Sequence, residues 1–182
     1  SPMRRVLLAA VVAVLLAGCQ RPDVPTVRPQ TPRPAPAEIV VALAPGLELV
    51  VLGTEEALAP AANDCTTMVH RLATPTGRYQ AAVLGADCTA GDAPGNGFHG
   101  YFPAPPRDAQ VERAATPVGP ALVFGSEYYE CTNSCATGID QVALVDVGGR
   151  MLQVIAETSP SGSQKSRERA DLVDLLQGLR SR

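Results

Sequence analysis

Two cysteines separated by three residues, Cys131 and Cys135, form the most obvious chemical pair in this chain. Thiols at such short spacing can form a disulfide, exchange electrons with another thiol, or bind a soft metal ion such as Cu(I). The other cysteines are Cys19, Cys65 and Cys88. If Cys19, which follows an apolar N-terminal run, is set apart, the remaining four form an even set. In an exported domain an even set favours structural disulfides and allows three pairings.

The predicted turns favour one of these pairings. Residues 66–73 and 78–86 flank Thr74-Pro75-Thr76-Gly77 and predict a β-hairpin. A two-residue turn at Thr76-Gly77 would place Cys65 directly opposite Cys88, at a Cβ spacing of about 4.5–5.5 Å, which is close to disulfide reach. Such a bridge would contribute about 3 kcal/mol through loop entropy. Cys131 would then pair with Cys135 and close a short loop.

A segment rich in glycine and proline, residues 89–108, carries a cluster of aromatic side chains. Phe98, His99, Tyr101 and Phe102 lie close together in it. Aromatic side chains on a loop are suited to contact with a ligand or a partner. The alternative is that they cap one end of the sheet. We treat these four as candidate ligand-binding residues.

The remaining polar residues suggest less chemistry. His70 lies in an apparent strand, and either His70 or His99 could serve as the base of a hydrolase. Glu127 and Glu130 flank two tyrosines, but on a strand their carboxylates would point to opposite faces. A general acid and base must converge across a cleft. No phosphate-binding loop, dinucleotide fingerprint, zinc-protease motif or nucleophile elbow is present, so the sequence names no catalytic residue, metal ligand or cofactor.

Short apolar runs around turn residues predict the strands that would position these groups. The runs lie at residues 39–43, 47–52, 66–73, 78–86, 121–129, 141–147 and 150–156. Gly148-Gly149 is a strong two-residue hairpin signal, because both glycines tolerate positive φ. Thr54 could cap one helical turn over residues 55–58.

The C-terminal segment has a helical pattern instead. Leu172, Leu175, Leu176 and Leu179 fall on one helix face, with Ser161 or Ser163 as the N-cap. Four polar side chains would face outward: Arg169, Asp171, Asp174 and Gln177. The chain is therefore predicted to be an α+β protein, with an antiparallel β-sheet built of hairpins and a C-terminal α-helix packed on it.

The N-terminal segment is typical of a secretory signal. Arg4 and Arg5 precede an apolar run, Val6 to Leu16, that is too short to span a membrane. The following residues, Leu16-Ala17-Gly18-Cys19, resemble the lipobox of bacterial lipoproteins. The resemblance implies cleavage before Cys19 and attachment of diacylglycerol to its sulfur. It also implies an anchor in the cell membrane or the outer membrane, facing the extracytoplasmic side.

The 182 residues then divide into three parts. Residues 1–18 are a signal peptide, residues 19–37 are the lipidated cysteine with a proline-rich tether, and residues 38–182 are a single globular domain. The whole chain has a formal charge of −3, whereas the domain alone has 10 basic and 17 acidic side chains. This acidic balance argues against nucleic acid as a partner, because such proteins carry a basic patch.

Two further resemblances concern the domain. The spacing of Cys131 and Cys135 resembles that of copper-delivery proteins and of the binuclear copper domain of cytochrome oxidase, although Ile139 stands where the oxidase pattern has a histidine. Several hairpins followed by a last helix are similar to the Mog1/PsbP-like lipoprotein folds.

The leading hypothesis is a non-enzymatic membrane-anchored lipoprotein whose disulfide-stapled domain binds an envelope protein or a small ligand. The alternatives are a thiol redox or copper-handling protein that uses Cys131 and Cys135, and an envelope hydrolase.

Overall fold

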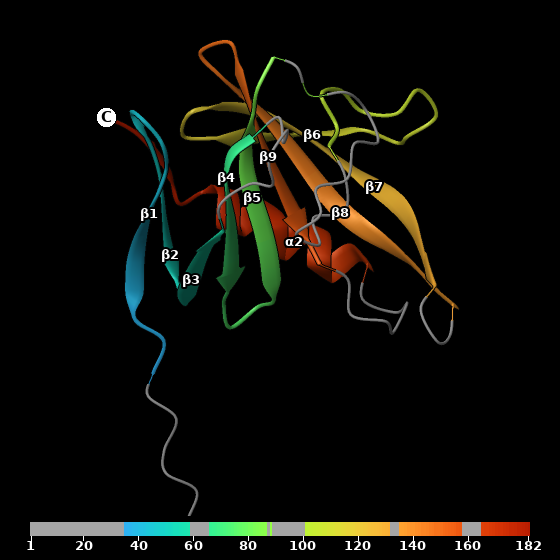
Figure 1. Cartoon of the computed structure of the whole chain (residues 1–182), viewed down its shortest axis with the longest axis horizontal. Coiled ribbons are helices and arrows are strands. Elements are labelled where there is room, and N and C mark those ends of the chain that lie inside the picture. The colour runs from blue at the N-terminus through green and yellow to red at the C-terminus, as the bar shows by residue number, and fades with distance from the viewer. Residues whose placement is uncertain (1–34, 59–65, 87, 89–100, 132–134, 158–164) are drawn as a thin grey trace, which may run out of the picture. The chain divides into compact units, whose positions relative to one another are not determined.

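The computed structural model describes residues 35–58, 66–86, 88, 101–131, 135–157 and 165–182. The described part forms two antiparallel sheets and one helix, α2 (Lys165–Leu176) (Figure 1). The smaller sheet has the order β1-β2-β10: β1 (Glu38–Ala44), β2 (Leu47–Leu52) and β10 (Leu179–Ser181). The larger sheet has the order β3-β4-β5-β9-β8-β7-β6: β3 (Thr54–Leu58), β4 (Thr66–Ala73), β5 (Arg78–Leu84), β6 (Glu112–Thr116), β7 (Gly119–Cys131), β8 (Cys135–Val147) and β9 (Arg150–Ala156).

The predicted fold class is confirmed, because antiparallel hairpins dominate and the C-terminal helix contacts the larger sheet. Strands β1 and β2 pair around the predicted Pro45-Gly46 turn, and Gly46 has a φ of 78°. Gly148 and Gly149 connect β8 to β9 with φ values of 61° and 82°. Positive φ at both central residues is what a tight two-residue hairpin turn requires.

The predicted register of the β4–β5 hairpin is wrong. Ala73 pairs with Arg78, so the connection has four residues, Thr74 to Gly77, instead of two. The Thr74 side chain stabilises this longer turn, since its Oγ1 accepts hydrogen bonds from the backbone N–H groups of Thr76 and Gly77, both at 3.2 Å. A second register shift follows between Thr66 and Val69. The argument that placed Cys65 directly opposite Cys88 therefore fails, and their pairing stays a prediction.

The helical turn predicted over residues 55–58, with Thr54 as its cap, is also wrong. These residues form the edge strand β3, which pairs antiparallel with β4 from Thr54 opposite Ala73 to Leu58 opposite Val69. The local helix propensity is overridden because the open edge of β4 offers backbone partners to the whole segment. The pairing brings Glu55 to His70, as described below.

The main core lies between one face of the larger sheet and a layer made by α2, β1 and β2. Leu172, Leu175 and Leu176 of the helix are buried in it, as their spacing predicts. Leu179 is fully buried too, but it begins β10 and is not helical. The helix ends because the backbone turns at Gly178, whose C=O accepts a 2.9 Å hydrogen bond from the N–H of Val50 in β2. The predicted caps, Ser161 and Ser163, lie outside the described residues.

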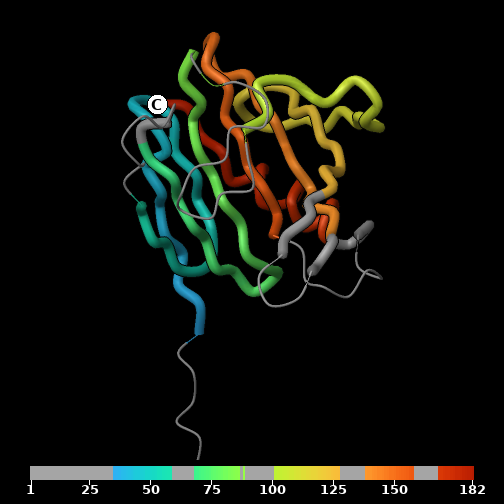
Figure 2. Tube along the Cα trace, turned by 45° about the vertical axis from the view of Figure 1, so that its right-hand side comes forward, coloured from blue at the N-terminus to red at the C-terminus, as the bar shows by residue number. Residues whose placement is uncertain are grey.

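A second core covers the opposite face of the larger sheet. It contains Phe124, Val142 and Ile155 together with Tyr101 from the connection that precedes β6. Successive residues of β5, β8 and β9 alternate between the two cores. This explains why these strands read as continuous apolar runs instead of an alternating pattern. Figure 2 shows the strands of the larger sheet side by side, and it shows the C-terminus beside the β1–β2 turn. There the N–H of Arg182 donates a hydrogen bond to the C=O of Gly46 at 3.1 Å.

Candidate functional site

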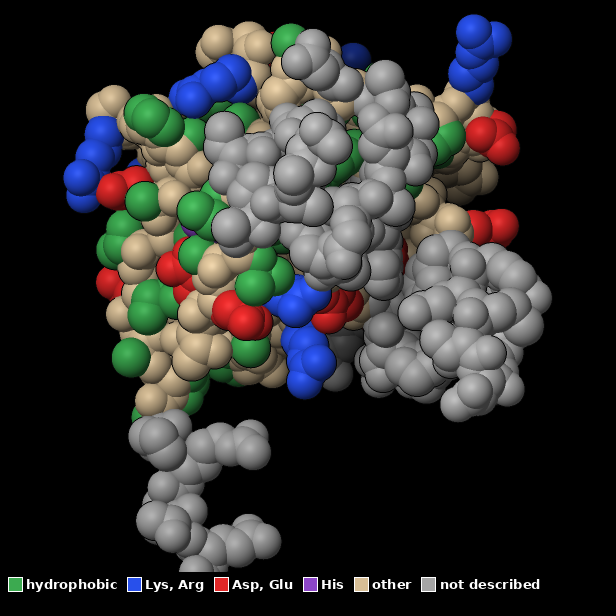
Figure 3. Space-filling model, in the orientation of Figure 1, with side chains coloured by type: hydrophobic (Ala, Val, Ile, Leu, Met, Phe, Trp, Pro, Cys, Tyr) green, Lys and Arg blue, Asp and Glu red, His purple; other side chains and the backbone are tan. Residues whose placement is uncertain are grey.

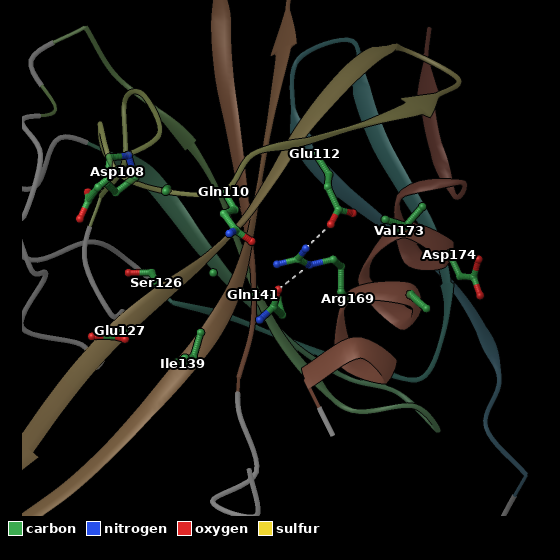
Figure 4. Close-up of a pocket in the computed structure, with 14 residues that line it drawn as sticks. Asp108, Gln110, Glu112, Ser126, Glu127, Ile139, Gln141, Arg169, Val173 and Asp174 are labelled. Carbon is green, nitrogen blue, oxygen red and sulfur yellow. Dashed lines mark hydrogen bonds and ion pairs between the residues drawn. The ribbon is translucent and has the colours of Figure 1, made fainter. Parts of the chain in front are cut away.

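A groove opens where the long hairpin β7–β8 extends past its neighbour β6. The last residue pair between β6 and β7 is Glu112 with Val123, whereas β7 continues to Cys131. The groove has a volume of about 1120 Å³ and is lined by β7, β8, residues 169–174 of α2, and the start of β6 with the residues just before it (Figure 4). This volume is slightly above the range of about 300–1,000 Å³ that is typical of small-molecule sites.

The floor of the groove contains a buried glutamine of β8. Gln141 of β8 is 2% exposed and pairs with Gly125 of β7. Because Gly125 has no side chain, the side chain of Ile139 packs directly over it. A Cβ there would lie 2.9 Å from Cγ2 of Ile139 and 3.7 Å from Nε2 of Gln141. The methyl group of Ile139 therefore occupies the space over the glycine, and the amide nitrogen of Gln141 lies beside it.

The orientation of that amide follows from its neighbour. Nε of Arg169, on α2, lies 2.9 Å from Oε1 of Gln141. A guanidinium can only donate, so the atom that faces it must be the amide oxygen. Nε2 of Gln141 then points to the other side, and no acceptor for it occurs among the described residues. The groove thus contains a donor of fixed orientation, which belongs to a residue that is 2% exposed and lines the groove.

Arg169 is held from two sides. Besides Gln141, it contacts Oε1 of Glu112 through Nη1, and the side chain is 26% exposed (Figure 4). The other charged residues of the lining are Asp108, Glu127 and Asp174. The lining therefore has four carboxylates and one guanidinium, which is already paired with Glu112. The groove is electronegative, and it favours a ligand that is cationic or carries a cationic group.

Charge is less concentrated on the face of the molecule that Figure 3 shows. Among the coloured side chains in Figure 3, acidic and basic groups are scattered between apolar and polar ones over the face shown there.

His70 forms a base–carboxylate pair at the other side of the sheet. Its Nδ1 lies 2.6 Å from Oε1 of Glu55, and the residue is 4% exposed. Its Nε2 is buried and has no hydrogen-bond partner among the described residues. The pair is the arrangement that the hydrolase alternative requires of a base and its orienting group. However, His70 does not line the groove, and no described contact joins it to a nucleophile.

The aromatic cluster is divided. Tyr101 is 1% exposed and packs in the second core, whereas Phe98 and His99 lie outside the described residues. Phe102 packs against the same core, and its ring meets that of Phe124 edge to face at a centroid distance of 5.6 Å. The Phe102 N–H also donates to Oε1 of Gln153 at 2.7 Å. The two described aromatics thus cover one face of the sheet, as in the alternative interpretation.

The cysteines are placed to different extents. The Cα atoms of Cys131 and Cys135 are direct partners at the end of the β7–β8 hairpin. Cys88 is 7% exposed, belongs to the second core and is disulfide-bonded, with a partner outside the described side chains. Cys19 and Cys65 lie outside the described residues. Among the described residues, no three His, Cys, Asp or Glu side chains come together as a metal site.

The groove residues were missed by the sequence interpretation. Arg169 was expected on the outward helix face, and neither Gly125 nor Gln141 was singled out. One signal was present: a glutamine beside the apolar run of residues 142–145, on a strand buried on both faces. The side chain of such a residue needs a hydrogen-bond partner, either in the protein or in a ligand.

Comparison with known protein families identifies the N-terminal segment. Residues 3–20 match the family described as the prokaryotic membrane lipoprotein lipid attachment site. This match covers no part of the folded residues, so the similarity to Mog1/PsbP-like folds stays a prediction. No curated protein matches the chain. No helix in the described part of the chain is long and apolar enough to cross a membrane. The chain is thus a lipid-anchored membrane lipoprotein that faces the extracytoplasmic side and is attached through the cysteine of its lipobox.

Proposed function

We propose that this lipoprotein is a non-enzymatic binding protein whose folded domain holds an envelope protein or a small ligand in the groove between β7, β8 and α2. The lipid anchor keeps the domain at the membrane surface, and residues 19–37 act as the tether between them. The observation that carries the proposal is Nε2 of Gln141, which belongs to a residue 2% exposed and faces the groove without a partner among the described residues.

A donor that lines a groove can bond to solvent or to a ligand, and a ligand acceptor of matching geometry would contribute about 0.5–1.5 kcal/mol. Arg169 supports the same interpretation, since two hydrogen bonds hold its guanidinium at the groove wall. A site that is ordered before its ligand arrives loses little conformational entropy on binding.

Disulfides would make the domain rigid enough for this role. We infer that Cys131 pairs with Cys135 and that Cys65 pairs with Cys88. The first pairing is supported by the backbone register, because direct antiparallel partners have Cα atoms about 4.5–5.5 Å apart, within disulfide range. The second is supported by the state of Cys88, which is buried and disulfide-bonded.

Photo-crosslinking in native cells tests the binding role. A photoreactive residue replaces Ala170, an exposed member of the groove lining on α2, in the full chain. The matched control carries the same residue at Val40, which is 55% exposed on β1 and outside the groove. We expect a discrete crosslinked product from position 170 and none from position 40.

A second variant links the product to the buried amide. Gln141→Leu keeps the approximate size of the side chain and removes the donor, so the yield from position 170 is expected to fall about fivefold or more. Circular dichroism of each variant confirms that it folds. Equal yields from positions 170 and 40, or a yield that Gln141→Leu leaves unchanged in a folded protein, would show that the groove is not the binding site.

A further inference from the structure

One edge of the larger sheet is left open beside the groove. β6 covers β7 only from Gly119 to Val123, and residues 125–131 of β7 have β8 on one side and no described strand on the other (Figure 1). The residues before β6 do not pair with this edge, and four of them, Pro106, Asp108, Ala109 and Gln110, line the groove. The groove therefore occupies the place where β6 would continue if it were longer.

The backbone groups that face this edge follow from the β6–β7 turn. Thr116 pairs with Gly119 across a two-residue turn, and such turns close on a hydrogen-bonded pair. Backbone groups point toward β6 at every second residue from Gly119 onward. By the same alternation, Gly125 and Glu127 present their N–H and C=O groups to the open edge. The groove is lined by Gly125 and Glu127 from one face of β7 and by Ser126 from the other, so it opens onto the edge itself.

We propose that the occupant of the groove is an extended peptide segment with a basic side chain, which adds to the edge of β7 as a further antiparallel strand. This inference rests on the proposed binding function and names the partner chemistry of that site. Strand addition supplies affinity through main-chain hydrogen bonds, and side-chain pockets supply specificity. Charge complementarity favours a positive charge on the peptide side chain, because the lining has four carboxylates and only one guanidinium, which is already paired.

The register fixes which side chains matter. Gly125 and Glu127 share the groove face with Gln141. A peptide residue opposite Glu127 would place a lysine or arginine beside that carboxylate. The residue opposite Gly125 comes two positions later in the peptide, and its side chain can cross the glycine to accept from Nε2 of Gln141. The recognised pattern is therefore a basic residue, any residue, and then a residue with an amide or hydroxyl side chain.

Binding of synthetic peptides to the full lipoprotein in lipid nanodiscs tests this inference by fluorescence anisotropy. The probe is a capped peptide as long as residues 125–131, with lysine and glutamine at the two positions just named and threonine or valine elsewhere. One matched peptide has glutamate in place of lysine. Another has the same sequence with N-methyl groups on the residues whose N–H groups would face β7. We expect the lysine peptide to bind, and each matched peptide to bind about tenfold more weakly or worse.

Two protein variants place the peptide on the edge of β7. Glu127→Gln removes one carboxylate and is expected to weaken binding about two- to fivefold. Glu56→Gln is its control, since Glu56 is an exposed carboxylate on β3, the opposite edge strand, and should leave binding unchanged. Equal binding of the N-methylated peptide overturns strand addition, and equal binding of the glutamate peptide overturns the basic requirement.

The outcomes also separate this inference from the proposed function. If no peptide binds while crosslinking from position 170 still depends on Gln141, the peptide inference is overturned and the groove remains a binding site for another ligand. If the crosslinks are absent as well, both are overturned.

Discussion

Buried polar side chains in this protein serve different purposes at the residue scale. Gln153 is fully buried and anchors the chain before β6 through the Phe102 N–H. Gln80, 3% exposed, donates to Glu157 at 2.6 Å. His70 is satisfied at Nδ1 by Glu55. Gln141 differs because its oxygen positions Arg169, whereas its nitrogen faces an open groove. A polar residue in an apolar strand predicts burial with a partner, but the identity of that partner depends on which strand lies alongside.

Tyr79 permits a pH prediction at the same scale. The ring is 2% exposed, and its hydroxyl lies 2.9 Å from Oγ1 of Thr76. Burial raises the pKa of Tyr79 above its ordinary value of 10.0, and Asp171 and Asp174 act in the same direction, whereas hydrogen bonds from Thr76 and Thr74 lower it. Above pH 10 the unfolded chain therefore loses this proton before the folded protein does. Stability is expected to fall in that range by at most about 1.4 kcal/mol per pH unit for this one proton.

Urea unfolding of the wild type and Tyr79→Phe at about pH 8 and about pH 11 checks this expectation. Phenylalanine loses the hydrogen bond to Thr76 and should cost about 1 kcal/mol at the lower pH. Its stability should then decline less between the two pH values, because it has no proton to release at this position. Tyr101 is also buried, but it is present in both proteins and cancels in the comparison. Parallel declines would contradict the assignment.

At the scale of elements, turn residues and apolar runs predict the hairpins that they form. The remaining strands and registers depend on pairing with other parts of the chain. The β1–β2 and β8–β9 hairpins follow from their turn residues, because Gly46, Gly148 and Gly149 supply positive φ. The β4–β5 register does not, because the Thr74 side chain stabilises a longer turn. Strand β3 depends on the edge of β4, and β6 and β10 are short strands formed against longer partners. The groove could not be predicted because it results from the unequal lengths of β6 and β7.

The junction between α2 and the smaller sheet gives a prediction at this scale. A Cβ on Gly178 would lie 2.1 Å from the backbone oxygen of Val50, so the helix end and β2 would have to separate. Gly178→Ala is expected to destabilise the protein by about 1–3 kcal/mol, measured by urea unfolding. Gly77→Ala is the control, since the nearest atom to its Cβ would be the Tyr79 hydroxyl at 3.7 Å, and its stability should change by less than about 1 kcal/mol. Equal effects of the two alanines would contradict this account of the junction.

At the scale of the whole molecule, the sequence establishes the membrane location and the fold class more firmly than the function. The lipobox and the short apolar run are local patterns, so residues 3–20 can be identified without any structure. The leucines of α2 predict a helix packed on a sheet for the same reason. The groove combines residues from β7, β8, α2 and the segment before β6. Residues from such distant positions carry no common spacing, and only the folded chain brings Gly125, Gln141 and Arg169 together.

The five cysteines provide the last prediction, which concerns the whole chain. If Cys19 carries the lipid and the other four cysteines form two disulfides, the protein extracted from membranes and denatured without reductant has no free thiol. Reduction then exposes four thiols, because the thioether at Cys19 resists it. Peptide mapping without reduction should link Cys65 to Cys88 and show an internal bridge between Cys131 and Cys135. Such bridges typically stabilise a domain by about 2–4 kcal/mol each, so reduction should also lower the urea midpoint. A bridge from Cys65 to Cys131 or Cys135 would refute this pairing, whereas free thiols or bound copper at Cys131 and Cys135 would favour a redox or copper-handling protein.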